Sequence, residues 1–209
     1  MPKQTFFNLP EEKKTRIVEV AIKEFSKNTF LNASVTKIAE NAGIAKGSIY
    51  QYFEDKKDLY KYMLEIAAQR KMTYFMDYIQ NMNDLDFFDL IRGLYVQGII
   101  FAKENPELAS IANNFLKEND AKFKEEILGE GYKKSDQFFE ELIEKAKAKG
   151  QLNPHVDTRI GASMLTTLST TIVDDLLHDM AYEDIISNEE RLLERVDKML
   201  FIMRNGFKV

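Results

Sequence analysis

The side chains best suited to chemistry in this chain lie in the segment 46–51. On a helix that buries Ile49, the outward positions are Lys46, Gly47, Ser48, Tyr50 and Gln51. Lysine pairs with phosphate, and hydroxyl and amide groups form hydrogen bonds with phosphates or with base edges in a DNA groove. The pattern therefore predicts binding of nucleic acid rather than catalysis.

The surrounding residues predict the elements that position this series. Residues 36–53 fit two short helices joined by a tight turn, with Thr36 as the expected N-cap and Gly43 supplying a positive φ. Ile44 and Ile49 are expected to hold the turn and the second helix on one core. This arrangement is a helix-turn-helix, whose second helix enters the major groove. The alternative is an ordinary helical hairpin, but the aromatic cluster of Tyr50, Tyr52 and Phe53 favours DNA recognition.

Lysines at the start of the next helix extend the predicted surface. Lys56 and Lys57 follow the helix-turn-helix directly and are expected to reach the DNA backbone beside the groove. The full set of predicted DNA-binding residues is Thr36, Lys37, Lys46, Gly47, Ser48, Tyr50, Gln51, Tyr52 and Lys56.

Composition limits the protein class. The 209 residues include no cysteine, so disulfides and thiolate chemistry are excluded. Four prolines, nine glycines and helical periodicity throughout predict an all-α fold. No apolar run is long enough to cross a bilayer, and the first ten residues lack the apolar core of a signal peptide. We therefore predict a soluble cytoplasmic protein.

Charge differs between the two ends of the chain. Residues 1–60 hold ten basic and eight acidic residues, a net charge of +2, and the remainder carries −7. Such a distribution suits a protein that contacts phosphates at one end, although +2 alone is a weak signal.

Periodicity and breaks in the pattern predict a helical map and two domains. The first helix is expected from about residue 9 to 28, and a long helix from about 57 to 82 joins the two domains. The domains are 1–56, a three-helix DNA-binding domain, and 57–209, a helical domain. The remaining helices are expected at 84–105, after Pro106, up to Gly150 with a break or bend near Gly129 and Gly131, at 157–180, and at 188–207.

The sequence gives little support for a catalytic or metal-binding site. The chain has two histidines and lacks a phosphate-binding glycine loop or a zinc-binding helix motif. His178 lies one turn after Asp174, a spacing that suits a metal site but is more typical of a surface ion pair. We predict no enzyme activity, no cofactor and no metal.

The chain resembles the TetR family of bacterial transcription regulators. The family pattern is met at Ile38, Ala39, Ala42, Gly43, Gly47, Ile49, Tyr50, Tyr52 and Phe53. The resemblance covers about the first 60 residues. It implies a repressor that binds a near-palindromic double-stranded DNA operator as a homodimer formed by the last two helices. It also implies that 57–209 is an effector-binding (ligand-binding) and dimerisation domain, and that a small-molecule effector releases the DNA.

The middle helices hold the residues that such an effector would contact. Candidate ligand-binding residues are Tyr95, Phe101, Phe115, Tyr132, Phe138, Met164, Thr167 and Thr171. Apolar walls with a few polar groups describe a small-molecule site, but they equally describe a helical core. Two alternatives stay open: an all-α ligand-binding protein or enzyme with a vestigial DNA-binding domain, and a DNA-binding protein without an effector.

Overall fold

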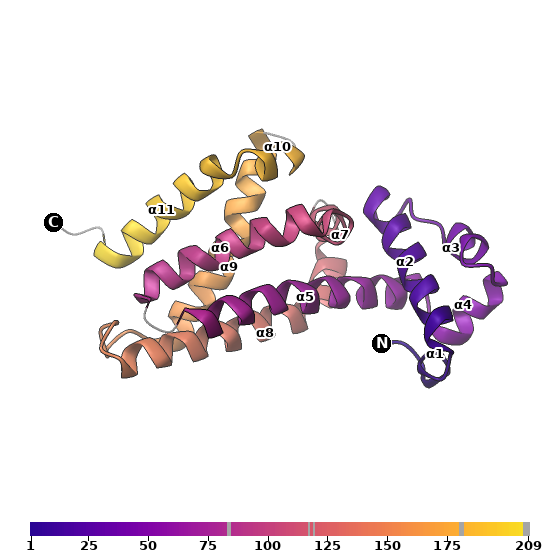
Figure 1. Cartoon of the computed structure of the whole chain (residues 1–209), viewed down its shortest axis with the longest axis horizontal. Helices are drawn as coiled ribbons and strands as arrows, with labels where there is room; N and C mark the ends of the chain where they lie inside the picture. Colours follow the sequence, from indigo (N-terminus) through magenta and orange to yellow (C-terminus); the bar gives the residue numbers. More distant parts are fainter. Residues whose placement is uncertain (83–84, 117, 119, 180–181, 207–209) are drawn as a thin grey trace. The chain divides into compact units, whose positions relative to one another are not determined.

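The computed structural model describes residues 1–82, 85–116, 118, 120–179 and 182–206. Within these ranges, the side chains at 121, 128, 130, 132, 170, 173–179, 182–183 and 185 are also outside the description. The described residues form helices, turns and loops without a strand, which confirms the predicted all-α fold (Figure 1). In that part of the chain, no helix combines the length and the apolar character that crossing a bilayer requires.

The chain divides into two compact units. The first comprises residues 1–73 and 104–121, and the second comprises 74–103 and 122–209. The long helix α5 (Lys56–Asn81) contributes to both units. The two units are defined by contacts within the chain, whereas the predicted boundary at residue 56 separates a DNA-binding domain from the rest of the chain. The boundary at residue 56 stays a prediction.

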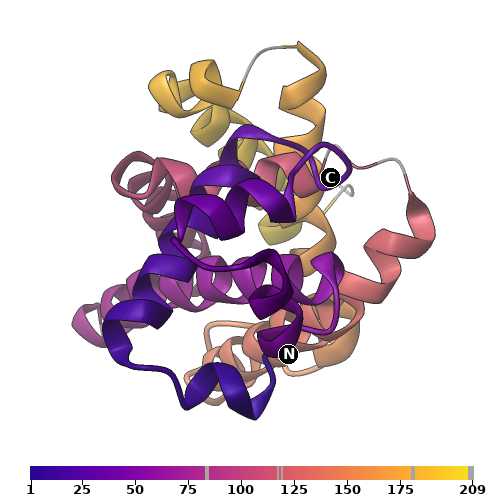
Figure 2. The ribbon, with the colours of Figure 1, turned by 90° about the vertical axis from the view of Figure 1, so that its right-hand side faces the viewer.

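The first unit contains α1 (Gln4–Phe7), α2 (Glu11–Lys27), α3 (Val35–Asn41), α4 (Lys46–Tyr52), the first part of α5 and α7 (Pro106–Leu116). Its core is made of apolar side chains at helical spacing, so each helix has one buried face. Residues Ile17, Ala21, Phe25, Ile38, Ile49, Leu59, Tyr60 and Met63 are fully buried. α2 packs on α3 and α7, and α3 packs on α4 (Figures 1 and 2).

The second unit contains α6 (Phe87–Glu104), α8 (Ala121–Ala148), α9 (Thr158–Asp179), α10 (Tyr182–Ser187) and α11 (Glu189–Asn205). Buried side chains of α6, α8, α9 and α11 form one core, with Phe75 and Tyr78 of α5 against it. Gly93 allows this packing, since a Cβ there would lie 2.0 Å from the Tyr78 hydroxyl oxygen. Arg92 and Asp197 form two hydrogen bonds of 2.6 and 3.2 Å between α6 and α11.

Three features differ from the predicted helical map. α1 and α10 are additional short helices. The predicted break near Gly129 and Gly131 does not occur, because α8 is helical from Ala121 to Ala148. An isolated glycine in a helix costs about 1 kcal/mol relative to alanine, which is too little to break a helix packed along one face.

Candidate nucleic-acid interface

The first helix of the motif begins at Val35, and its N-cap lies two residues before the predicted cap. Ser34 is the N-cap of α3, and its Oγ accepts a hydrogen bond of 3.3 Å from the backbone nitrogen of Lys37. The backbone nitrogen of Ser34 in turn donates to Glu24 Oε1 at 2.9 Å. The assignment of Thr36 as the cap is wrong, because Thr36 already lies inside α3 and Ser34 holds the extended backbone that a cap requires.

The turn between α3 and α4 has the positive φ that was predicted for Gly43. Gly43 has a φ of 69°, and its nitrogen donates to Glu40 O at 3.1 Å. The nitrogen of Ile44 donates to Ala39 O at 3.0 Å. These two bonds form a Schellman motif, which ends α3 and satisfies two of its terminal carbonyls. The turn therefore fixes the direction in which α4 leaves α3.

α4 presents one face to solvent and buries the other. Ile49 is fully buried, and Tyr52 retains 7% exposure. Lys46, Gly47, Tyr50 and Gln51 are exposed and share one face, since they are spaced by one and four residues. Ser48 and Thr36 are half-buried, and Lys37 on α3 is exposed.

Tyr52 differs from the other predicted contacts. Its ring lies 6.2 Å from that of Phe6, and Lys13 Nζ lies 5.8 Å from the Tyr52 ring centroid. The side chain therefore belongs to the core that supports α4 rather than to the exposed face. The sequence pattern placed it in the motif but did not show which way it points.

Lys56 is half-buried, and its ammonium group contacts the protein's own backbone. Its Nζ donates to the carbonyl oxygens of Leu31 at 3.1 Å and Ala33 at 3.0 Å. It also lies 4.7 Å from the ring centroid of Phe30. Burial lowers the pKa of Lys56, and the nearby carboxylates of Glu118 and Glu24 oppose this shift. The structure therefore shows Lys56 tying α5 to the connector between α2 and α3.

Comparison with known proteins agrees with this geometry. A family model described as "Bacterial regulatory proteins, tetR family" matches residues 17–63, which include α3 and α4. A solved TetR family transcriptional regulator from Chloroflexus aurantiacus is 31% identical, with 99% of this chain and 98% of that chain covered and a TM-score of 0.62. This chain belongs to the TetR family. It is a DNA-binding transcription regulator with an N-terminal helix-turn-helix and a helical C-terminal region.

More distant TetR-family relatives extend the similarity over most of the chain. The "Probable acrEF/envCD operon repressor" of Escherichia coli K12 is 23% identical over 205 residues, which is 95% of this chain and 92% of that protein. The transcriptional regulator FadR from Bacillus subtilis, solved in complex with stearoyl-CoA, has the same fold. It is 20% identical, with 87% of this chain and 96% of that chain covered and a TM-score of 0.65.

The predicted ligand-binding residues are distributed over both units, and their common role in binding a ligand stays a prediction. Tyr95, Phe101 and Phe138 lie in the second unit, whereas Phe115 belongs to the first, where its ring is 6.3 Å from that of Tyr60. The side chain of Tyr132 lies outside the described residues. The side chain of His178 does so as well.

The three predicted ligand-binding residues of α9 are exposed. Met164 has 47% exposure, and Thr167 and Thr171 are also exposed. α9 instead buries Ala162, Leu165 and Ile172. Helical spacing predicts which residues share a face, but it does not determine which face is buried when both carry apolar side chains.

Tyr95, a predicted ligand-binding residue, is half-buried and forms a hydrogen bond with α9. Its hydroxyl oxygen lies 3.2 Å from Ser169 Oγ, which in turn donates to Leu165 O at 2.7 Å. Burial raises the pKa of Tyr95, because the ionised phenolate would lose its hydration. In the same unit, Asp136 Oδ1 and Thr166 Oγ1 are buried and have no hydrogen-bond partner among the described residues.

The contacts between the N-terminal segment and α4 were not predicted from the sequence. Lys3 and Thr5 bond to the carbonyl oxygens of α4, and Phe6 is 1% exposed. The adjacent aromatic residues Phe6 and Phe7 were the available signal, because an aromatic pair in an otherwise polar N-terminal segment indicates packing.

Proposed function

We propose that this chain represses transcription by binding a near-palindromic operator as a homodimer, and that a small-molecule effector releases it. The observation that carries the proposal is the exposed face of α4. Lys46, Tyr50 and Gln51 project from a helix whose opposite face is anchored by Ile49. Their charged, hydroxyl and amide groups match phosphates and base edges in a major groove. Lys37 on α3 is proposed to add a phosphate contact.

Exposed apolar residues on α9 and α11 support a homodimer. Ile160 and Met164 on α9 are 63% and 47% exposed, and Phe201 and Ile202 on α11 are 66% and 41% exposed. Ile160 and Met164 are one helical turn apart on α9, and Phe201 and Ile202 are adjacent on α11; exposed apolar patches are typical of an interface. Phe201 and Ile202 also line an open groove of about 800 Å³ with Arg92, Leu193 and Lys198. A dimer would place two recognition helices about 34–36 Å apart, or at a multiple of that spacing.

Buried polar groups in the second unit support an effector site. In the described part of the chain, Asp136 Oδ1 and Thr166 Oγ1 have no hydrogen-bond partner, and a buried polar atom without a hydrogen bond costs about 1–3 kcal/mol. A bound molecule with an apolar body and a hydrogen-bond donor would satisfy such atoms. We expect its coupling to DNA binding to be about 1–3 kcal/mol, the usual range for allosteric proteins.

Selection of random DNA fragments by the purified protein tests the proposal, with salt and competitor DNA controlled. We expect one near-palindromic site to be enriched, and Lys46→Ala to weaken binding to it. The matched control is Lys27→Ala, in the last turn of α2. A folded dimer that enriches no site, even after small molecules are removed by unfolding and refolding, would contradict the proposal.

The effector part is tested separately by measuring DNA affinity with added ligand. Stearoyl-CoA is the first probe, since the Bacillus subtilis regulator of the same fold was solved with it. A probe that binds the second unit should weaken operator binding by about 5- to 150-fold at saturation. A probe that binds there and leaves the operator affinity unchanged would refute the coupling.

A further inference from the structure

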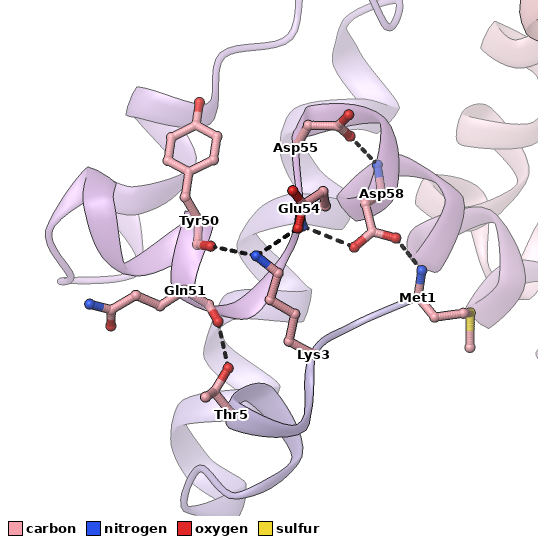
Figure 3. Close-up of polar contacts among 8 residues, drawn as sticks. All are labelled: Met1, Lys3, Thr5, Tyr50, Gln51, Glu54, Asp55 and Asp58. Carbon is pink, nitrogen blue, oxygen red and sulfur yellow. Dashed lines mark hydrogen bonds and ion pairs between the residues drawn. The ribbon is translucent and has the colours of Figure 1, made fainter.

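The N-terminal segment completes the hydrogen bonding of the recognition helix. The last carbonyl groups of a helix have no partner within it. In α4, Ile49 O accepts from the nitrogen of Phe53 at 2.8 Å. The next three carbonyl oxygens all accept from residues 3 and 5. Lys3 Nζ donates to Tyr50 O at 3.1 Å, and Thr5 Oγ1 donates to Gln51 O (Figure 3). The backbone nitrogen of Lys3 donates to Tyr52 O at 2.7 Å.

Aromatic packing fixes the segment that supplies these donors. Phe6 is 1% exposed, and its ring lies 5.0 Å from that of Phe53 and 5.6 Å from that of Tyr62. Burial of a phenylalanine side chain stabilises by about 1.5–3 kcal/mol. α1 is therefore part of the packed first unit, and Lys3 and Thr5 stand on a fixed support.

Charged contacts connect the same segment to the start of α5. Lys3 Nζ lies 2.8 Å from Glu54 Oε2, and the nitrogen of Met1 pairs with Asp58. Asp58 also accepts a hydrogen bond of 3.1 Å from the nitrogen of Glu54, and its own nitrogen donates to Asp55 Oδ1 at 2.8 Å (Figure 3). The segment thus joins the end of α4 to the beginning of the next helix.

These contacts act on the residues proposed to meet DNA. α4 has seven residues, and a helix this short is not stable by itself. The bonded carbonyls of Tyr50 and Gln51 belong to the two residues whose side chains project from its exposed face. A cation beside the C-terminal carbonyls is also favourable with the helix dipole. A shift of this end would move both side chains relative to a base pair.

We infer that Lys3 and Thr5 are positioning residues for DNA recognition. They hold the C-terminal end of α4 so that Tyr50 and Gln51 meet the groove in one orientation. The inference rests on the proposed DNA-binding face of α4. It predicts that losing these bonds lowers the fraction of protein in the binding-competent arrangement, and that specific affinity falls by the same fraction.

Thr5→Val is the cleanest test, because it replaces one hydroxyl by a methyl group at an exposed site without changing charge. Thr5→Ser keeps the hydroxyl and is the matched control. We expect Thr5→Val to raise the Kd for the selected operator by about three- to tenfold, with Kd for random DNA unchanged. Hydrogen exchange of the α4 amides should quicken in Thr5→Val and return to the parent rate in Thr5→Ser.

Lys3→Met separates a positioning role of Lys3 from a direct contact with phosphate. A lysine on a phosphate contributes about one to the slope of log affinity against log salt. We expect Lys3→Met to weaken operator binding by about tenfold without changing this slope. A slope reduced by about one per protomer would overturn the inference. Unchanged operator affinity in Thr5→Val, or equal losses on operator and random DNA, would also overturn it.

The parent protein and Gln51→Ala separate this inference from the proposed binding face. If Gln51→Ala binds the operator with parental affinity and sequence preference, then the assignment of the α4 face fails. If Gln51→Ala changes preference while Thr5→Val does not weaken binding, the face stands and the positioning role fails.

Discussion

Replacement of Lys56 by methionine should destabilise the protein without removing a DNA contact. Methionine keeps the apolar stem but loses the ammonium group, which donates to Leu31 O and Ala33 O and lies 4.7 Å from the Phe30 ring. The connector between α2 and α3 would then lose these contacts with α5 and keep the packing of Phe30 on Tyr60. This prediction separates two roles for one lysine, a structural tie and a phosphate contact.

The size of the effect follows from these contacts. A hydrogen bond to a charged group contributes about 1.5–3 kcal/mol, and an exposed cation–π contact about 0.5–1 kcal/mol. The site is partly exposed, so water can replace part of this interaction, and losing the ammonium also removes its desolvation cost. We therefore expect the free energy of unfolding to fall by about 2 kcal/mol, or Tm by about 4–8 °C for a chain of this length.

Thermal unfolding and DNA binding at several salt concentrations measure the two roles together. Lys46→Met is the matched variant, because Lys46 is exposed on the proposed DNA-binding face. We expect Lys46→Met to keep the parent Tm and to reduce the salt slope by about one per protomer, and Lys56→Met to do the reverse. The structural role of Lys56 is refuted if Lys56→Met keeps the parent Tm and loses salt dependence.

Three further outcomes are expected. Gln51→Ala should change sequence preference by more than it changes overall affinity, and an equal loss on operator and random DNA would place Gln51 on a phosphate. Ile160→Glu with Phe201→Glu should give monomers in analytical ultracentrifugation at micromolar concentration, because a charge would be buried at the proposed interface; a retained dimer would place the interface elsewhere. Burial raises the pKa of Tyr95 above its ordinary value of 10.0, so the folded protein holds this proton more tightly than the unfolded chain does. Its contribution to stability is therefore full below about pH 10 and is lost as pH rises through the folded pKa, and Tyr95→Phe should reduce the alkaline loss of stability seen in pH-dependent unfolding; an identical alkaline loss would contradict this assignment.

Local patterns predicted most of the fold because local interactions define it. The turn at Gly43, the helix up to Lys27, and the long helix from Lys56 to Asn81 all follow from residues a few positions apart. Their caps, apolar spacing and backbone angles depend on near neighbours. The family model matches residues 17–63, which include the turn and parts of both helices.

The binding face was only partly predictable for a physical reason. The sequence identified the exposed series on α4, but Tyr52 and Lys56 carry side chains that suit either a DNA surface or an interior contact. Their directions depend on Phe6, Leu31 and Ala33, which lie at least 23 residues away along the chain. Residue type alone does not distinguish these cases.

By itself, the sequence determined a helix-turn-helix at residues 36–53, an all-α chain and membership of a regulator family. These follow from hydrogen bonds and apolar spacing within one or two helical turns. Only the tertiary structure showed that Lys3 and Thr5 donate hydrogen bonds to the last carbonyl oxygens of α4. It also showed that Lys56 bonds to the connector between α2 and α3, and that α9 buries Leu165 while exposing Met164. The hydrogen bonds join residues 23 to 49 positions apart. The buried face of α9 is selected by the packing of the whole unit.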